Sequence, residues 1–430
     1  MRRSRARTRS TQPERPNRLR RSAILATAAT AATVAAGCGT PDGAAGRAAC
    51  TTPGFSADSV KIGWVYPDSG AVSSGMISAR SGFVARVEQQ NAAGGIHGRK
   101  ITFAWRDDAG SNLQNLQAMH DLVDNERVFG VVESTTAAAG GADFLHAQGI
   151  PVAGLPAEPL WADHTYNNMF AHGYLITNGP SVDVFGTFVR AKGGTKAAMV
   201  LSDSNGTANQ ISEKIAESLR AAGIPVSPQT FIYNESSSNP LQLGQQLKAA
   251  GVDTVIGTLP AADASDIMTG AHTAGAQIRV FLSAAGYNRA ILQEKGPTIA
   301  GLYTYMNYVP FVNPTPAHDR YLAAIQAYAP ELEPPDQEMA LLSYIGTDIF
   351  LTGLLRGPDC PTRASYITTL RNVTDYNADG LLPGVVDFKN WGQLNLCYSI
   401  VRVNDQGTDY ELVKDPNGAN QWCGKRLPNQ

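Results

Sequence analysis

Three loops of this chain place hydroxyl groups, a glycine or a carboxylate directly after an apolar run. Asp68-Ser69-Gly70 follows VKIGWVY, Ser134-Thr135-Thr136 follows VFGVVE, and Leu155 to Glu158 follow IPVA. If the apolar runs are parallel strands, these loops lie beyond the carboxyl ends of the strands, where helix N-termini point their free N–H groups. Hydroxyls and N–H groups there bind a small polar solute, although helix capping is an alternative role for the three hydroxyls. The candidate residues are Ser69, Gly70, Ser134, Thr135, Thr136, Pro156, Ala157 and Glu158.

The sequence lacks the patterns of the common hydrolases and of metal sites. It has no Gly-x-Ser-x-Gly, no HExxH and no phosphate-binding P-loop. We therefore expect no enzymatic activity, no cofactor and no metal, with a hydrolase as a remote alternative. The seven histidines show no metal-ligand spacing: His97, His120, His146, His164, His172, His272 and His318.

The stretch NAAGGIHGRKITF looks at first like a phosphate-binding loop because it combines glycines with cations. A dinucleotide loop, however, follows a strand and opens a helix, whereas this stretch follows a helical pattern and enters a strand. We expect Gly94 and Gly95 to end the helix with positive φ and Gly98 to permit the reversal. Arg99 and Lys100 are then expected to face solvent.

The first 37 residues differ in composition from the rest and are interpreted as an export signal. They contain nine arginines and one glutamate, followed by an uncharged run from Ser22 to Gly37. That run of about 16 residues is shorter than the roughly 20 apolar residues of a membrane-spanning helix, which is the alternative. Ala35-Ala36-Gly37-Cys38 resembles a bacterial lipobox, so we expect lipid at Cys38 and anchoring to the outer face of the cell membrane. Arg20-Arg21 also resembles a twin-arginine signal, and the export route stays open.

Residues 38–58 are rich in Gly, Ala, Thr and Pro and are predicted to be a flexible tether. Without the signal the chain has 26 basic and 36 acidic residues, and this negative balance argues against nucleic acid as a partner. The four remaining cysteines predict two disulfides, and three pairings are possible. We prefer Cys360 with Cys397 and Cys50 with Cys423; a zinc site is the alternative, but no CxxC spacing supports it.

Short apolar runs alternate with helical patterns along the rest of the chain. Strands are predicted at 60–66, 100–108, 128–134 and 150–155, with helices at 77–90, 112–126 and 136–148 between them. The alternation restarts with helix 180–192 and continues to the strand at 302–309. Helices follow at 317–328, 337–356 and 362–373, and CYSIVRV and YELVKD form a hairpin around NDQG. The pattern indicates an α/β fold with two doubly wound parallel sheets, joined more than once as in a hinged clamp.

Two stretches carry a distinctive pattern. VKIGWVYPDSGAVSSG joins a strand to a Pro-x-Ser-Gly loop, and ARVEQQNAAGGIHGRKITFAWRDDAGSN joins a helix, a turn, a strand and an acidic pair. Both resemble a known family, the type I periplasmic solute-binding proteins of ABC transporters, in the leucine/isoleucine/valine-binding branch. The first stretch has Asp68 where leucine is usual in that family, and the second matches the family almost position by position. The resemblance covers Val60 to Val413 and implies a Venus-flytrap fold. Lobe 1 is then expected at 59–177 and 304–395, and lobe 2 at 178–303 and 396–430.

The resemblance also implies where the ligand binds. In amino-acid-binding relatives the loops matching Ser134-Thr136 and Leu155-Glu158 hold the ligand's carboxylate. Other positions depart from the family pattern: Ser204 and Asn205 lie where an aromatic is usual, and Ala285 lies where a glutamate pairs with the α-ammonium. Because a buried unpaired ammonium is costly, we expect a ligand other than a standard α-amino acid, one that is neutral, aromatic or amide-like. Glu158, beside Trp161, either accepts a cation or amide or faces solvent, and Tyr287 either lines the pocket or packs in the core; Leu259 completes the candidate set.

The function implied by the resemblance is capture of a small solute and its delivery to the permease subunits of an ABC transporter. The protein is expected to act as a monomer. A ligand-sensing receptor domain of the same fold, signalling to a membrane partner, is the alternative. Closure on the ligand requires contacts with both lobes, because only differential affinity shifts a conformational equilibrium.

Overall fold

Five parallel strands form the first sheet of the computed structural model, which describes residues 50–174, 176–202 and 206–429. Its central strand and the next one, Val131–Glu133 and Val152–Gly154, are fully buried, as expected for a parallel sheet that helices cover on both faces. In spatial order the strands are β2 (Lys100–Asp107), β1 (Ser59–Tyr66), β3 (Val131–Glu133), β4 (Val152–Gly154) and β5 (Met169–Phe170).

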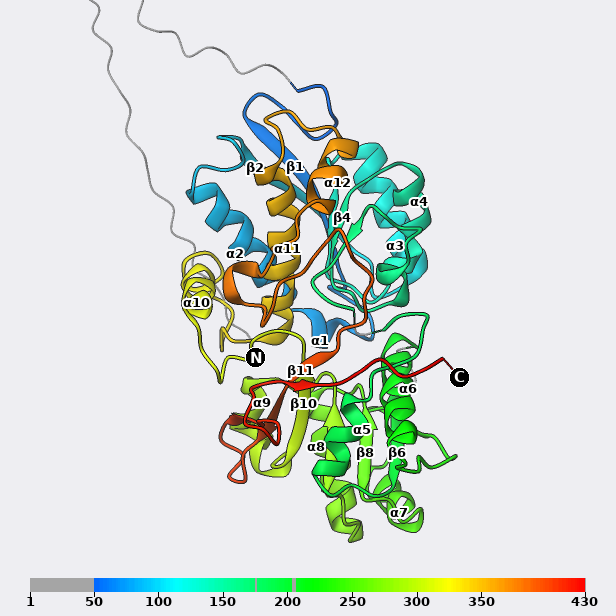
Figure 1. Cartoon of the computed structure of the whole chain (residues 1–430). Coiled ribbons are helices and arrows are strands. Elements are labelled where there is room, and N and C mark those ends of the chain that lie inside the picture. The colour runs from blue at the N-terminus through cyan, green and yellow to red at the C-terminus, as the bar shows by residue number, and fades with distance from the viewer. Residues whose placement is uncertain (1–49, 175, 203–205, 430) are drawn as a thin grey trace, which may run out of the picture. The chain divides into compact units, whose positions relative to one another are not determined.

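Side chains of β1 alternate between the two faces of this sheet and therefore contact different helices. Ile62 and Trp64 belong to a core that includes residues of α2 and α11, whereas Val65 belongs to a core with α3 and α4. The first face is covered by α2 (Ala79–Ala92), α11 (Glu338–Arg356) and α12 (Arg363–Arg371), and α10 (Pro316–Tyr328) packs against α2 (Figure 1). The second face is covered by α3 (Asn112–His120), the π-helical turn Asp121–Asn125 and α4 (Ala142–Ala147).

Helix α11 lies unusually close to its neighbours because glycines face it. A Cβ added to Gly82 of α2 would lie 1.8 Å from the carbonyl oxygen of Ala340, and one added to Gly346 would lie 3.1 Å from the Cα of Gly154 on β4. Among the described residues α11 is also the one helix long and apolar enough to cross a membrane, but 78% of that stretch is buried in the protein. It is therefore a core helix, and its close packing fixes the position of its first residue.

The second sheet has eight strands, five parallel and three antiparallel. The parallel strands are β7 (Phe231–Tyr233), β6 (Ala197–Ser202), β8 (Thr254–Gly257), β9 (Val280–Ser283) and β10 (Leu302–Met306). Next to β10 lies the antiparallel strand β11 (Cys397–Val403), which pairs with β12 (Tyr410–Leu412) and β13 (Trp422–Cys423).

Helices cover both faces of the second sheet as well. Asn239 caps α7 by accepting a hydrogen bond from the Gln242 amide at 3.1 Å, and Asn288 caps α9 by accepting from the Ala290 amide at 2.9 Å. One face packs against α5 (Val184–Ala191) and α6 (Gly206–Ala221), and the other against α7 (Pro240–Ala249) and α8 (Ala261–Ala274), with α9 (Arg289–Lys295) next to α8 (Figure 1).

The chain passes three times between the first lobe, built on the first sheet, and the second lobe, built on the second sheet. The passages lie between β5 and α5, between β10 and α10, and just before β11. The first and third are bonded to each other, since the Asn395 amide donates to the Tyr174 carbonyl at 3.1 Å. The lobe boundary expected at 304 needs correction: β10 pairs with β9 and β11 over its whole length, so the return to the first lobe follows Met306.

The two doubly wound sheets and the C-terminal hairpin predicted from the sequence are confirmed, with local differences. The helix predicted at 136–148 is interrupted: a 3-10 turn, Ala138–Gly140, precedes α4. A Cβ at Gly140 would lie 2.0 Å from the Asn112 carbonyl oxygen, so this turn is pressed against α3. The short elements α1 (Ser73–Met76), α9, β5 and β13 were not predicted, because each is too short to show a hydrophobic period.

The expected disulfide pairing is wrong. Cys397 is bonded to Cys423, and Cys50 is bonded to Cys360. The reason for the first pair is β13, which brings Cys423 directly opposite Cys397 in an antiparallel ladder. Because Cys50 is bonded to the folded body and Phe55 packs against Phe129, the tether predicted over 38–58 ends before Cys50.

Arg99 is another correction, since its side chain is fully buried instead of facing solvent. Its guanidinium donates to Asp359 Oδ1 at 2.6 Å and to the Ser56 carbonyl at 3.0 Å, beside the Cys50–Cys360 disulfide. Lys100 is exposed as expected, and Gly94, Gly95 and Gly98 all have positive φ. The NAAGGIHGRKITF loop is therefore a turn that also holds the N-terminal segment.

Candidate functional site

A cavity of about 480 Å³ lies between the two lobes. Its wall in the first lobe comes from α1, from the loops after β3 and β4, and from the start of α11. Its wall in the second lobe comes from the loops after β7, β8 and β9 and from the start of α8. The cavity thus meets the carboxyl ends of the strands of both sheets, where open α/β sheets bind ligands.

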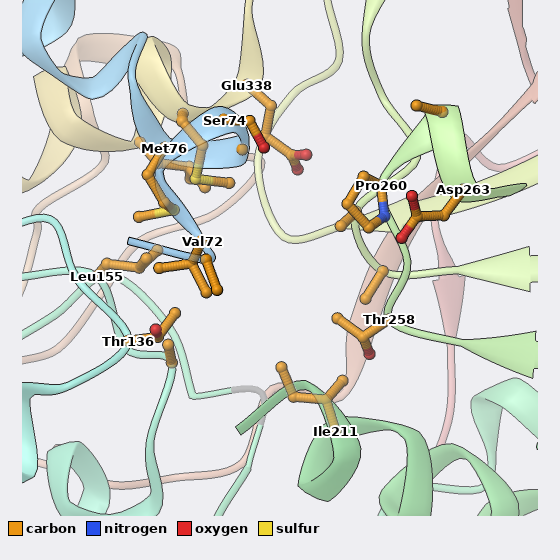
Figure 2. Close-up of a pocket in the computed structure, with 18 of the residues that line it drawn as sticks. Val72, Ser74, Met76, Thr136, Leu155, Ile211, Thr258, Pro260, Asp263 and Glu338 are labelled. Atoms are coloured by element: carbon orange, nitrogen blue, oxygen red, sulfur yellow. The ribbon is translucent and has the colours of Figure 1, made fainter. Parts of the chain in front are cut away.

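Apolar side chains form much of the cavity wall in both lobes. Val72, Met76 and Leu155 line it from the first lobe, and Ile211 and Pro260 line it from the second (Figure 2). Helix α1, which carries Met76, follows the loop after β1. These surfaces suit the hydrocarbon part of a small molecule.

Glu338 is the first residue of α11, and its carboxyl group lines the cavity (Figure 2). The side chain is 8% exposed, and the Tyr308 hydroxyl donates to its Oε1 at 3.1 Å. Burial raises the pKa of Glu338 to about 8, although the Tyr308 hydrogen bond opposes the shift. Without a ligand this carboxyl group is therefore mostly protonated at pH 7.

Asp263, in the first turn of α8, lines the cavity from the second lobe (Figure 2). Burial, together with the nearby acidic groups of Glu235 and Asp266, raises the pKa of Asp263 to about 6 against the opposing effect of Lys295. Glu235 itself lies on the rim of the same cavity and is exposed. Two walls of the cavity therefore carry acidic groups.

His172 lines the cavity next to the first passage between the lobes. The imidazole is 6% exposed, and neither ring nitrogen has a hydrogen-bond partner of good geometry among the described residues, although Asn307 is nearby. Burial lowers the pKa of His172 to about 4. The ring is therefore neutral at pH 7 and offers one donor and one acceptor.

The charges of the wall have one sign. Among the described residues that line the cavity, Glu235, Asp263 and Glu338 are acidic, and none is lysine or arginine. In the described part of the chain no group of three or more His, Cys, Asp or Glu side chains is arranged to hold a metal ion. The wall therefore supplies hydrogen-bond acceptors and negative charge, with no fixed cation for a carboxylate.

Four of the residues predicted from the sequence line this cavity: Thr136, Pro156, Ala157 and Ala285. They come from the loops after β3, β4 and β9, at the strand ends that the sequence indicated. The remaining described candidates do not line it, and each has a visible structural role: Ser69, Gly70, Ser134, Thr135, Glu158, Trp161, Leu259 and Tyr287.

Three candidate side chains bond to the protein interior near the cavity. The Ser134 hydroxyl is 2.9 Å from the Ser343 hydroxyl of α11, and Thr135 Oγ1 accepts from the Ala137 amide at 3.2 Å. Glu158 neither binds at the wall nor faces solvent: it is buried and accepts from the Ala139 amide at 3.1 Å. Burial raises the pKa of Glu158 to about 7, while the Ala139 and Ala138 amides act in the opposite direction.

The Ser69-Gly70 loop is held by Asp107, whose carboxylate accepts from the Ser69 hydroxyl at 2.5 Å. Gly70 has φ of 86°, and a Cβ there would lie 2.5 Å from the Ala109 carbonyl oxygen, so glycine is required for this turn. This loop leads into α1, which does line the cavity.

The apolar candidates are core residues. Trp161 and Leu259 are fully buried, and Tyr287 packs against Tyr410 with ring centroids 4.4 Å apart. Ser204 and Asn205 lie outside the described residues, as do Cys38 and the signal sequence.

Several lining residues were not predicted, although the strand-end rule extends to some of them. Asn234 and Glu235 directly follow β7, and Thr258 follows β8, so applying the rule to the second sheet would have nominated all three. The strand-end rule does not apply to Glu338 or His172. Glu338 reaches the cavity at the start of the long helix α11, and His172 reaches it in the first passage between the lobes.

Comparisons with known proteins agree with this fold. The family described as periplasmic binding protein matches residues 59–408. The branched-chain amino acid transporter substrate-binding protein LivJ of Streptococcus pneumoniae, solved with isoleucine, is 16% identical with a TM-score of 0.67, over 83% of this chain and 99% of that one. A fatty acid ABC transporter substrate-binding protein of Thermomonospora curvata is 15% identical with a TM-score of 0.68, over 84% and 93%.

A third structure, an ABC transporter solute-binding protein from R. palustris in complex with benzoate, is 14% identical with a TM-score of 0.68, over 85% of this chain and 97% of that one. At these identities the structures show a common fold. No curated protein matches the sequence.

Proposed function

This chain belongs to the periplasmic binding protein family, and from that premise we propose that it captures a small solute between its two lobes and delivers it to the permease of an ABC transporter. Proteins of this family and fold are extracytoplasmic solute-binding proteins of the ABC-transporter type and not enzymes. The observation that carries the proposal is the cavity, because residues of both lobes form its wall. A solute there contacts both lobes, which is the condition for shifting an equilibrium between open and closed forms.

We also propose that the protein is anchored in the membrane by lipid at Cys38, after removal of residues 1–37. The support is the sequence Ala35-Ala36-Gly37-Cys38 at the end of a positively charged, weakly apolar leader. The tether between Cys38 and Cys50 then links the lipid to the folded body. A lipid anchor holds the binding protein near its permease.

The ligand in this proposal is not a standard α-amino acid. Two of the hydroxyls expected to hold a carboxylate, those of Ser134 and Thr135, instead bond within the protein. No lysine or arginine among the described lining residues replaces them. Ala285 lines the cavity at the position where amino-acid-binding relatives have a glutamate that pairs with the α-ammonium of the ligand. The missing glutamate is a second argument against an α-amino acid as the ligand.

The test is a thermal-shift screen of the purified protein against amino acids, amides, amines, aromatic acids, sugars and nucleosides. A binding solute at 100 times its dissociation constant should stabilise the protein by about 2.7 kcal/mol. Uptake of the radiolabelled hit is then compared in cells with and without this protein. Loss of uptake supports delivery to a permease, unchanged uptake favours the sensing alternative, and a shift with leucine alone would overturn the ligand argument.

A further inference from the structure

We propose that the solute is an organic cation, a protonated amine or amidine on an apolar body, held between Glu338 of the first lobe and Asp263 of the second. This inference rests on the proposed function and names the class of its ligand. It is carried by the position of the two carboxyl groups on opposite walls of one cavity. Figure 2 shows both carboxyl groups turned toward the space between the lobes.

Neither carboxyl group has a cationic partner in the cavity wall. The Tyr308 hydroxyl donates to Glu338, and Lys295, whose charge acts on Asp263, is 3.4 Å from Asp266 instead. A buried carboxyl group without a counter-charge is normally protonated or paired. A ligand cation supplies the missing charge, whereas a ligand carboxylate would meet the acidic groups of Asp263 and Glu235 with no cation in the described wall to pair with it.

The burial of Glu338 predicts how the site responds to such a ligand. Because its carboxyl group is mostly protonated at neutral pH, a bound cation should lower its pKa and release a proton. The titratable groups around Glu338 are the hydroxyls of Tyr308, Tyr305 and Tyr410, with Asp263 and Glu235 on the other wall of the cavity. Affinity for a cation is therefore expected to rise from pH 6 to pH 8.5.

His172 provides an independent sign that a ligand completes this cavity. It is buried in the wall, neutral, and without a well-formed hydrogen bond among the described residues. A buried unpaired polar group is costly, so a ligand donor or acceptor at this ring would remove a penalty. A polar group next to the cationic centre of the ligand, or a second N–H of its amine, can form a hydrogen bond with the imidazole of His172.

The rest of the wall selects an organic cation over a metal ion. Val72, Met76, Leu155 and Ile211 offer hydrocarbon contacts on both lobes, and the volume of about 480 Å³ suits a small molecule. In the described chain no cluster of side chains provides metal coordination. The cation therefore belongs to a molecule with an apolar part.

The experiment uses three probes of one shape and different charge: benzylamine, benzyl alcohol and benzoate, with butylamine and benzamidine to vary the body and the head group. Binding to the purified protein is measured by thermal shift and calorimetry at pH 6, 7 and 8.5, in buffers of different ionisation enthalpy. We expect amines or amidines to bind at least tenfold more tightly than the alcohol, with proton release, and benzoate not to bind.

The matched variants are Glu338→Gln and Asp263→Asn, with Glu213→Gln, an exposed acid of α6 that does not line the cavity, as control. Each of the first two should weaken amine binding more than tenfold, while the control leaves it unchanged. Their unfolding temperatures and circular dichroism are compared with the unaltered protein, and Glu338→Asp is used if Glu338→Gln does not fold.

The outcomes separate this inference from the proposed function. If benzoate or another carboxylate binds and Glu338→Gln leaves its affinity intact, the cation inference is wrong and the solute-binding function stands. If amines bind equally well to Glu338→Gln and Asp263→Asn, the assigned site is wrong. If no solute of any class in the wider screen binds, the proposed function itself is overturned.

Discussion

Glu133 lies at the carboxyl end of β3 and is completely buried below the cavity-forming loops. Asn115 donates to its Oε1 at 3.2 Å and to Asp108 at 3.0 Å, while Glu133 Oε2 has no hydrogen-bond partner among the described residues. Burial raises the pKa of Glu133 to about 8, and the charges of Asp108 and Glu158 add to the shift. The folded state therefore holds a proton on Glu133 that the unfolded chain has lost at neutral pH.

This difference predicts that stability falls as pH rises. Between the ordinary glutamate pKa and about 8 the folded protein binds one more proton at Glu133 than the unfolded chain, so each pH unit costs about 1.4 kcal/mol. Glu133→Gln removes this titration and keeps the shape, so it should make the dependence less steep, with the slope left by Glu158 and Glu338, and make the variant the more stable form at pH 8. Urea unfolding at pH 5, 6, 7 and 8 measures both slopes. Parallel slopes for the variant and the unaltered protein would contradict the assignment.

The sequence could predict which loops reach the cavity, but not which way each side chain turns. Strand ends follow from apolar runs, and Thr136, Pro156 and Ala157 do line the cavity. Ser134 turns inward because Ser343 of α11, 209 residues later in the chain, lies within hydrogen-bond distance. Such a contact depends on the packing of α11 and has no local signal in the sequence.

At the scale of elements, the two sheets were predictable because buried parallel strands and their covering helices alternate along the chain. The disulfides were not, because their pairing depends on β13, a two-residue strand with no pattern of its own. The two bonds close very different lengths of chain, 310 residues for Cys50–Cys360 and 26 residues for Cys397–Cys423.

The difference in loop length predicts unequal contributions to stability. In the chain-entropy description, losing Cys50–Cys360 costs about 5.7 kcal/mol and losing Cys397–Cys423 about 3.5 kcal/mol. The variants are paired serine substitutions, Cys50→Ser with Cys360→Ser and Cys397→Ser with Cys423→Ser, so that neither leaves a free thiol. Urea unfolding of both should show the larger loss for the first pair. A larger loss for the second pair would mean that local packing at β11 outweighs chain entropy.

At the scale of the whole folded body, the lobes are connected by packing as well as by the three passages. One hydrophobic cluster contains residues of both lobes, including Met306 and Tyr308 at the second passage. A continuous series of ring contacts runs through the same region, with centroids 4.4 to 6.2 Å apart: Tyr410, Tyr287, Phe311, Tyr321 and Tyr344. Phe311 is the link between the second-lobe ring of Tyr287 and the first-lobe ring of Tyr321.

This shared packing predicts that the two lobes unfold together, and that Phe311→Ala uncouples them. Differential scanning calorimetry of the unaltered protein should show one transition, because unfolding either lobe exposes apolar surface of the other. Phe311→Ala removes a half-buried ring from the junction. It should cost about 2 kcal/mol and split or broaden the transition.

Phe144→Ala is the matched control, since Phe144 is also half-buried but packs within the first lobe alone. It should lower the single transition without splitting it. Two separate transitions in the unaltered protein would instead show that the passages join the lobes without coupling their stability.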